Sequence, residues 1–489
     1  MRVVVIGAGA TGLGVAWDLA LRGVDVVVVE AHEVGVGTSG RFHGLLHSGG
    51  RYLVTDPNAA QECYRENVLL RVIAPNAVVA TGGYFVKKYG DDDNFERRWT
   101  HQAEALGVPI REVPPAELRQ ALPMLTPDIE RAYWVPDGVL EGFRMLTMLV
   151  AAIQARGSRL LERTRAVGIR TESHRVTGVE VEGPDGHRTL DCDAVVNAAG
   201  PWAGLIAHDW GIDVKVQPSY GLMLIFANRR MDQVVNRLKL PSDGDIFVPH
   251  QEVVILGTTD VAQPCPDAPE PDRLEAIRLM SLGAELVPDL GSWRVLRGFN
   301  GVRPLYEPSG LTDDSRTVSR DFAVLNHGDR DGLAGAFSVL GGKWTTFRLM
   351  GEVLGDKLAE SLDMRLPSRS ADTVIEAHRT TQATSRRHPV DRGALLCECE
   401  GVYESDLDNE TASQTQMRFG TWFSMGPCQG TFCAHRVLGR RSAAQFAQEM
   451  AWLRHEREHG LNVVGWGSNA RLIALEQATK AQTLAEDLS

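Results

Sequence analysis

Four cysteines near the C-terminus have the residue type and the spacing of a metal site. Cys397 and Cys399 form a C-x-C pair, and Cys428 and Cys433 form a C-x4-C pair after 28 intervening residues. Four thiolates are sufficient for a [2Fe–2S] cluster or for a tetrahedral zinc ion. Zinc ribbons usually space each pair as C-x2-C, and unrelated buried thiols would not crowd into 37 residues. We therefore predict a metal centre in a reducing compartment.

A second group of residues with recognisable chemistry lies at the N-terminus. Residues 7–12 read G-x-G-x-x-G between an apolar run at 2–6 and an expected helix at 12–22, and Glu30 ends the next expected strand at 24–29. Such a turn lets the backbone approach a pyrophosphate at the helix N-terminus, and the carboxylate accepts both ribose hydroxyls. The spacing predicts a site for FAD or NAD rather than for NADP.

The segment after the second strand separates these two cofactors. Residues 35–41 form another loop of small residues, and two histidines and two arginines are interleaved with glycines over 41–52. This composition suits an extended flavin nucleotide lying across a sheet, because glycine allows close approach of the backbone. A surface loop would not require it, so we expect FAD.

Further turns between expected elements would position the cofactor. A strand at 193–199 ends at Gly200, and a strand at 336–340 leads into Gly341-Gly342 before a helix that begins near Thr345. The first junction lets the backbone approach the diphosphate. The second junction directs a helix N-terminus at the electron-rich end of a flavin.

Composition limits what the whole chain does. A length of 489 residues suggests about three domains, and the formal net charge of −12 argues against binding of nucleic acid. No window offers ~18 uncharged apolar residues, so we expect a cytoplasmic protein without a transmembrane helix. Short β patterns with proline-rich turns at 86–144 and 216–320 indicate a separate substrate domain, which makes the nucleotide domain discontinuous.

Several longer stretches resemble the FAD-dependent glycerol-3-phosphate dehydrogenases, within the glycine/D-amino-acid oxidase structural superfamily. The resemblance is carried by Arg41–Tyr52, Asn197–Trp202, Pro241–Ile246, Ile255–Asp260, Gly301–Leu305, Val318–Arg320 and Gly341–Met350, in the family's order over about residues 1–360. The cysteine-bearing segment is similar to the bacterioferritin-associated-ferredoxin-like (BFD-like) [2Fe–2S] domain. This order of domains is similar to that of the large (A) subunit of anaerobic glycerol-3-phosphate dehydrogenase.

The resemblance implies an α/β fold with three parts. They are a Rossmann-like FAD-binding domain of the glycine/D-amino-acid oxidase type, a β-rich α+β substrate domain and a small C-terminal [2Fe–2S] domain. The corresponding ranges are 1–85, 145–215 and 321–362 for the FAD-binding domain, 86–144 and 216–320 for the substrate domain, 363–394 for an exposed linker, and 395–489 for the [2Fe–2S] domain with a helical tail.

The same resemblance implies roles for single residues. Single-subunit relatives carry an active-site histidine in a Lys-Gly-Ser-His-like stretch, but the segment here reads Pro218-Ser-Tyr-Gly-Leu222. A base must take the hydroxyl proton as the hydride leaves, and we expect His47 as the first candidate and His43 as the second; the alternative role for either is to orient the flavin or pack against it. Catalytic roles fall to His47, Arg51, Arg303 and Lys343, and substrate binding to Arg51, Arg303, Lys343 and Thr345. The residues expected to bind FAD are Gly7, Gly9, Thr11, Gly12, Glu30, Thr38, Ser39, Arg41, His43, Gly44, Gly200, Gly342, Lys343, Trp344 and Thr345, and the metal ligands are Cys397, Cys399, Cys428 and Cys433.

The implied activity is oxidation of sn-glycerol 3-phosphate to dihydroxyacetone phosphate by hydride transfer to the flavin. Electrons would leave through the [2Fe–2S] cluster to partner subunits of a membrane-associated complex and a quinone, at the cytoplasmic face of the inner membrane. Two alternatives stay open at this point. One is a related dehydrogenase or oxidase that acts on another hydroxy acid or amino acid. The other is a noncatalytic redox or metal-delivery protein, against which the intact segments Gly7–Glu30 and Gly341–Met350 argue.

Overall fold

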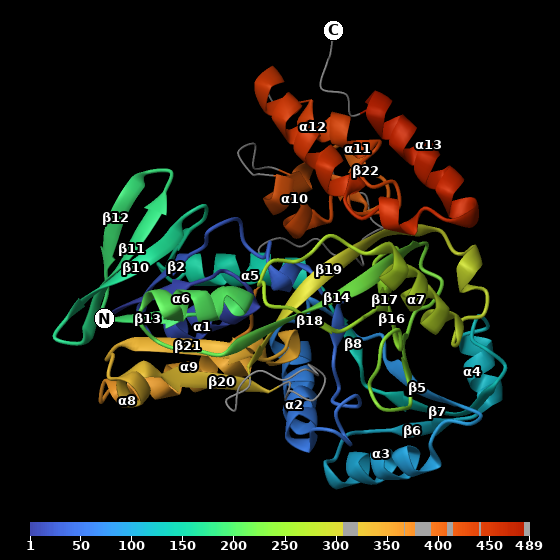
Figure 1. Ribbon diagram of the computed structural model, residues 1–489, viewed down its shortest axis with the longest axis horizontal. Helices are drawn as coiled ribbons and strands as arrows, with labels where there is room; N and C mark the ends of the chain where they lie inside the picture. Colours follow the sequence, from blue (N-terminus) through green and yellow to red (C-terminus); the bar gives the residue numbers. More distant parts are fainter. Residues whose placement is uncertain (307–320, 366, 377–392, 408–413, 440–441, 484–489) are drawn as a thin grey trace.

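The computed structural model describes the chain with the exception of residues 307–320, 366, 377–392, 408–413, 440–441 and 484–489. Two large sheets lie next to each other, and the C-terminal helices lie over the region where the two sheets meet (Figure 1). The first sheet carries the N-terminal glycine motif, and the second is the larger of the two.

The first sheet has six strands in the order β20–β21–β13–β1–β2–β9. Its pairs are parallel except at the edge, where β20 runs antiparallel to β21. The residues of β1 and β2 are almost all valine and isoleucine, which suits parallel strands that are covered on both faces. The strands are β1 (Arg2–Ile6), β2 (Asp25–Val29), β9 (Arg159–Leu161), β13 (Ala194–Asn197), β20 (Phe322–Asn326) and β21 (Ala336–Gly341).

Helices cover one face of this sheet, and an antiparallel meander covers the other. The helices α1 (Ala10–Leu21), α5 (Gly142–Gln154) and α9 (Phe347–Ser361) share an apolar core with β1 and β2. The valines of β11 pack against the opposite face, between the neighbouring strands β10 and β12. The meander strands are β10 (Arg165–Glu172), β11 (Arg175–Gly183) and β12 (Gly186–Asp191). The carboxyl ends of β1 and β13 thus meet the start of α1, which is where open α/β sheets bind ligands.

The second sheet follows the order β18–β14–β17–β16–β15–β5–β7–β6, and β19 pairs with β14. The long β14–β19 pair sets Ser219 opposite Arg303. Helices α3 (Asp93–Ala105), α4 (Pro115–Ala121) and α7 (Arg273–Ala284) are interspersed among these strands in the chain. The strands are β5 (Gly83–Lys88), β6 (Arg111–Val113), β7 (Ile129–Val135), β14 (Val216–Ala227), β15 (Val234–Arg237), β16 (Ile246–His250), β17 (Val253–Gly257), β18 (Val261–Ala262) and β19 (Val295–Tyr306).

Two elements cross the domain boundaries that the sequence suggested. Strand β5 belongs to the second sheet although it begins before residue 85, and α5 packs on the first sheet although it begins before residue 145. Helix α2 (Pro57–Ile73) and a small sheet connect the two large sheets. The small sheet contains β3 (Leu45–Leu46), β4 (Val78–Val79) and β8 (Gly138–Leu140).

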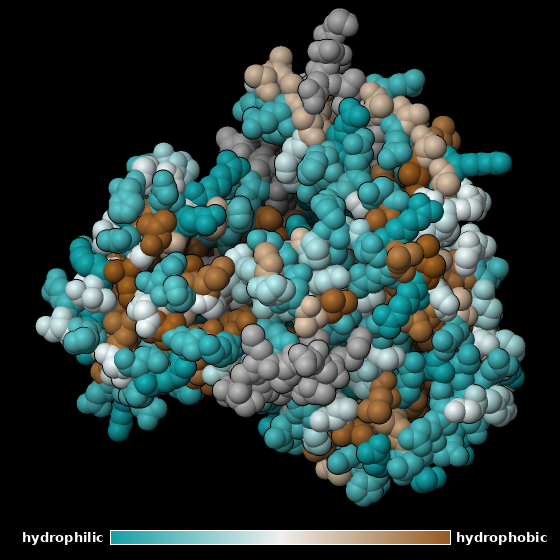
Figure 2. Space-filling view, in the orientation of Figure 1, coloured by the Kyte–Doolittle hydropathy of each residue, from teal (hydrophilic) through white to brown (hydrophobic). Residues whose placement is uncertain are grey.

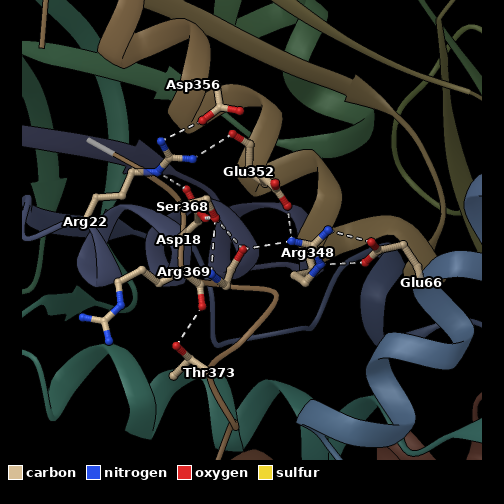
Figure 3. Close-up of polar contacts among 10 residues, drawn as sticks. Asp18, Arg22, Glu66, Arg348, Glu352, Asp356, Ser368, Arg369 and Thr373 are labelled. Carbon is tan, nitrogen blue, oxygen red and sulfur yellow. Dashed lines mark hydrogen bonds and ion pairs between the residues drawn. The ribbon is translucent and has the colours of Figure 1, made fainter. Parts of the chain in front are cut away.

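Part of the segment expected to be an exposed linker is packed against α2 and the helices of the first sheet. Ser370 is fully buried, and its hydroxyl accepts a hydrogen bond of 3.0 Å from Arg348 Nη1. The Arg348 guanidinium also makes a two-pronged contact with the Glu66 carboxylate at 2.6 and 2.9 Å, and Ser368 donates to Asp18 (Figure 3). These contacts hold the segment that follows α9 against α2 and α9.

The C-terminal region contacts both larger parts of the molecule. Phe419 of α10 (Gln414–Thr421) stacks on Phe143 of α5 with ring centroids 4.1 Å apart. Val463 and Val464 insert into the apolar core of the second sheet. Its other elements are β22 (Leu395–Cys397), β23 (Val402–Tyr403), α11 (Cys433–Leu438), α12 (Ala443–Glu458) and α13 (Gly467–Thr483). Among the described helices, none combines the length and the apolarity needed to cross a membrane.

Candidate functional site

A cavity of about 1720 Å³ lies between the two sheets and is continuous from the glycine motif to the second sheet. It collects nearly all of the side chains singled out from the sequence. Of the residues expected to bind FAD or substrate, Gly12, Gly44 and Thr345 do not line it. Those that line it are Gly7, Gly9, Thr11, Glu30, Thr38, Ser39, Arg41, His43, His47, Arg51, Gly200, Arg303, Gly342, Lys343 and Trp344.

The end of the cavity at the first sheet has the geometry of a nucleotide site. The carboxylate of Glu30 accepts hydrogen bonds from the backbone N–H of Ala8 at 2.8 Å and of His32 at 2.9 Å. Gly9, Ala10 and Thr11 at the start of α1 line the cavity, and the Ala10 N–H donates to Ser39 Oγ at 2.8 Å. This end therefore offers a carboxylate for ribose hydroxyls and a positive helix end for phosphates.

Gly12 acts on this site through packing. A Cβ at this position would lie 1.8 Å from the carbonyl oxygen of Gly7, a distance that no side chain tolerates. The glycine lets α1 start directly against the turn that ends β1. Gly12 therefore shapes the phosphate loop although it does not line the cavity.

The end of the cavity at the second sheet is cationic. Arg51 Nη2 lies 2.9 Å from Asp245, and Arg303 Nη2 donates to the carbonyl oxygen of Thr259 at 3.0 Å. Lys343 Nζ lies 4.8 Å from the centroid of the Tyr52 ring. These three cations come from three different elements, and they can converge on an anionic substrate group.

Buried histidines lie beside these cations. Burial, followed by the charges of Arg51 and Arg303, lowers the pKa of His43 to about 3. Burial also holds the pKa of His47 well below its usual range, with further contributions from His43, Arg51 and Lys343. Both imidazoles are therefore neutral near pH 7. His43 Nδ1 accepts a hydrogen bond from the backbone N–H of Leu45 at 3.1 Å, so Nε2 carries its proton.

Residues 218–222, where the sequence departs from the expected histidine-bearing stretch, contribute a serine to the end of the cavity at the second sheet. Ser219 donates a hydrogen bond to Asp260, whose Oδ1 lies 3.6 Å from Arg303 Nη1. Asp245 and Asp260 both lie in segments that carried the family resemblance. The sequence therefore marked both positions but did not indicate what these residues do. They orient the arginines that face the cavity.

A pair of carboxyl groups near Lys343 was not anticipated. Glu62 of α2 contacts Asp321, which lines the cavity, and burial followed by the charge of Asp321 raises the pKa of Glu62 to about 7. Glu62 lies within the regular polar pattern of a helix, which gives no signal that distinguishes it from a solvent-facing residue. Glu62 is thus a group that titrates near neutral pH and contacts a residue of the cavity wall.

Thr345 has a supporting position rather than a place on the cavity surface. Its hydroxyl accepts a hydrogen bond of 3.2 Å from the backbone N–H of His47. Trp344, its neighbour, lines the cavity and donates from Nε1 to the carbonyl oxygen of Ser39 at 3.0 Å. Thr345 and Trp344 thus connect the Gly341-Gly342 turn to the loop that carries His47 and to the loop that carries Ser39.

The four C-terminal cysteines also come together. Cys428 contacts the thiols of Cys399 and Cys433, and Cys433 contacts Cys397. The side chains of Cys399 and Cys433 lower the pKa of Cys428 to about 2. The contacts run in a row, and within the described ranges no group of three or more His, Cys, Asp or Glu side chains is placed to hold a metal ion.

Comparison with known proteins agrees with this geometry. A family model described as FAD dependent oxidoreductase matches residues 2–356. Subunit A1 of the anaerobic glycerol-3-phosphate dehydrogenase of Haloferax volcanii is 37% identical over 99% of this chain and 91% of the relative.

Two solved structures share the fold. Glycine oxidase from Geobacillus kaustophilus has a TM-score of 0.61 at 20% identity, over 77% of this chain and 99% of that one. The FAD complex of the glycerol-3-phosphate dehydrogenase from Bacillus halodurans has a TM-score of 0.60 at 17% identity, over 100% and 96%. The expected α/β fold of the glycine/D-amino-acid oxidase type is therefore confirmed. The chain belongs to the FAD dependent oxidoreductase family, among the A subunits of anaerobic glycerol-3-phosphate dehydrogenase.

Proposed function

We propose that this chain oxidises sn-glycerol 3-phosphate to dihydroxyacetone phosphate and transfers the electrons to a partner. The observation that carries the proposal is that Arg51, Arg303 and Lys343 line the same cavity as the nucleotide loop and act electrostatically on the histidines within it. An anionic substrate bound there would lie beside neutral histidines and next to the cofactor. The relatives named for this activity support the choice of substrate.

The residues that line the cavity fit FAD. Glu30 would bind the ribose, the N–H groups at the start of α1 would bind the diphosphate, and the loop from Thr38 to Arg41 would border the rest of the nucleotide. Bound FAD supplies an acceptor for the hydride that leaves the carbinol carbon of the substrate. The volume of about 1720 Å³ leaves room for both molecules.

The cationic residues would hold the phosphate of the substrate. A guanidinium group presents two parallel N–H donors, which match two phosphate oxygens, and Lys343 adds a point charge. Asp245 and Asp260 form ion pairs with the two arginines. The arginine side chains are therefore already ordered, and little side-chain entropy is lost when the substrate binds. This arrangement orients the secondary hydroxyl relative to the histidines.

His47 would accept the hydroxyl proton as the hydride leaves. Its imidazole is neutral because burial and the surrounding cations disfavour the charged form. Only the neutral ring has a lone pair that can take a proton. His43 is the weaker candidate, because its Nδ1 is already occupied by the Leu45 N–H.

The four cysteines fit a [2Fe–2S] cluster in their chemistry. Backbone N–H groups of Gly430 and Phe432 point to the Cys428 sulfur, and those of Ser424 and Glu400 point to the Cys397 sulfur. Such N–H···S contacts are part of how proteins tune iron–sulfur clusters. The row of thiols suits a binuclear cluster better than one zinc ion, whose four ligands surround a point. A cluster held there would accept and release single electrons.

The acceptor would be a further subunit. The relatives are named as subunits, which supports the existence of partner subunits. In our proposal these partners take up the electrons at the cytoplasmic face of the inner membrane and deliver them to a quinone. In this arrangement the chain is a peripheral member of the complex. Association with the membrane would come from those partners.

The decisive experiment is anaerobic reduction of the purified protein. The visible spectrum is recorded before and after addition of sn-glycerol 3-phosphate, and turnover is followed with an artificial electron acceptor. We expect loss of flavin absorbance followed by reduction of the iron–sulfur chromophore. Bleaching by another hydroxy acid or an amino acid, without bleaching by glycerol 3-phosphate, would contradict the proposed substrate. Glycerol serves as the control that lacks the phosphate.

A further inference from the structure

A group of arginines lies between the flavin cavity and the cysteines. Arg418 of α10 and Arg457 of α12 are 5% and 1% exposed, and Arg297 of β19 is partly buried next to them. Arg457 reaches the loop that carries Cys428. Its Nη1 donates to Gln429 Oε1 at 3.2 Å, and its Nη2 donates to Ser424 Oγ at 3.4 Å.

These guanidinium groups lie around Glu456, whose charge acts on all three. Arg418 Nη1 lies 3.8 Å from Glu456 Oε2, and Arg297 Nη1 donates to the backbone oxygen of Glu456 at 2.8 Å. Arg41, which lines the flavin cavity, acts electrostatically on Arg297 and Glu456 as well. The Nε atoms of Arg297, Arg418 and Arg457 are buried without a hydrogen-bond partner in the described part of the chain.

This arrangement leaves buried positive charge in excess. Burial, partly offset by Glu456, lowers the pKa of Arg418 to about 10, and burial with the repulsion of Arg418 and Arg297 lowers the pKa of Arg457. Buried charges are costly unless an opposite charge compensates for them. Glu456 is the carboxylate that compensates for Arg457, and the Arg457 guanidinium points to Gln429, the residue after Cys428, so the excess positive charge lies on the side of the cysteines.

We propose that Arg297, Arg418 and Arg457 form a cationic wall for the four-cysteine site and raise the reduction potential of the iron–sulfur cluster held there. The inference rests on the proposed function, from which it takes the cluster. Four thiolates give such a site a net negative charge, and reduction adds one more negative charge. Nearby cations stabilise the reduced form more than the oxidised form. The added electron comes from the reduced flavin, and no covalent bond is made or broken.

The test is a redox titration of the purified, cluster-containing protein in which EPR follows the reduced cluster. Arg457→Gln removes one charge and should lower the equilibrium constant for cluster reduction at least tenfold, which is about 59 mV for a one-electron couple. Arg457→Lys restores the charge and should recover most of the potential. Arg454→Gln is the matched control, because Arg454 lies on the same helix, is half-exposed and pairs with Glu458.

Arg297→Gln provides a second variant that does not depend on the cysteine loop. Arg297 belongs to the second sheet, and its substitution should lower the potential in the same direction by a smaller amount. Unchanged potentials in Arg457→Gln and Arg297→Gln, or an equal drop in Arg454→Gln, would overturn the cationic wall and leave the cluster in place. A wild-type protein without iron and acid-labile sulfide would overturn the cluster itself and, with it, this inference.

Discussion

Replacement of Arg303 by methionine separates recognition of the phosphate from the other roles of the cavity. Methionine keeps most of the length of the side chain and removes the guanidinium group. Ser219 also donates to Asp260, so this carboxylate retains a hydrogen bond in the variant. Loss of a charge-assisted hydrogen bond costs about 1.5–3 kcal/mol. The KM for glycerol 3-phosphate should therefore rise roughly 10- to 150-fold, and the spectrum of bound FAD should stay unchanged.

The assay measures the rate of anaerobic flavin reduction against the concentration of glycerol 3-phosphate and, in parallel, of glycerol. If Arg303 contacts the phosphate, the variant should lose its preference for glycerol 3-phosphate over glycerol, because the low rate of flavin reduction by glycerol does not change. Arg303→Lys should recover part of the loss, since lysine restores the charge without the two parallel donors. Arg330→Met, at a side chain that is 40% exposed, is the control for loss of an arginine. An unchanged KM, or an equal rise for both substrates, would refute the assignment.

Three further variants test the structure around the site. Gly12→Ala places a Cβ 1.8 Å from the Gly7 carbonyl oxygen and should abolish retention of FAD on gel filtration, whereas Gly291→Ala, with no atom within 4 Å of its Cβ, should retain it. Arg348→Met leaves the buried Glu66 without its partner and should lower the free energy of unfolding in urea by about 3–5 kcal/mol, and Arg348→Met with Glu66→Leu should recover much of that loss. Glu62 has a folded-state pKa of about 7 against an ordinary 4.5, so its contribution to stability is present below pH 4.5 and is lost as the pH rises through 7. Glu62→Gln should flatten the decline of the melting temperature over this interval, and an identical pH profile in the variant would contradict the raised pKa.

The nucleotide-binding elements were predictable because local sequence dictates them. The expected strands at 2–6 and 24–29 correspond to β1 and β2, and the expected helix at 12–22 corresponds to α1, which begins two residues earlier. Runs of β-branched residues on either side of a glycine turn and an apolar helix are typical of this arrangement. The junctions at Gly200 and Gly342 follow the same logic, and both reach the cavity.

The features that escaped prediction depend on contacts between distant parts of the chain. Glu62 becomes a group that titrates near pH 7 only because folding places Asp321 beside it. Ser370 lies in a serine- and arginine-rich stretch that is typical of an exposed linker, yet Arg348 draws it into a buried network (Figure 3). A polar residue is buried when a partner elsewhere compensates for its desolvation, and a single sequence does not name that partner.

The net charge of −12 is a sum over the whole chain and does not show where single charges lie, and the redox sites depend on charges that are buried. In the hydropathy view of Figure 2, hydrophilic residues cover most of the visible face, whereas Arg418 and Arg457 are almost fully buried. A charge removed from water interacts more strongly with its neighbours, because the effective dielectric constant around it is lower. A few buried cations are therefore sufficient at each site. One group of cations would bind the substrate phosphate, and the other would stabilise the four-thiolate site. Arg303 and Arg457 differ in what their loss should change, a KM in the first case and a potential in the second, which makes the two groups experimentally separable.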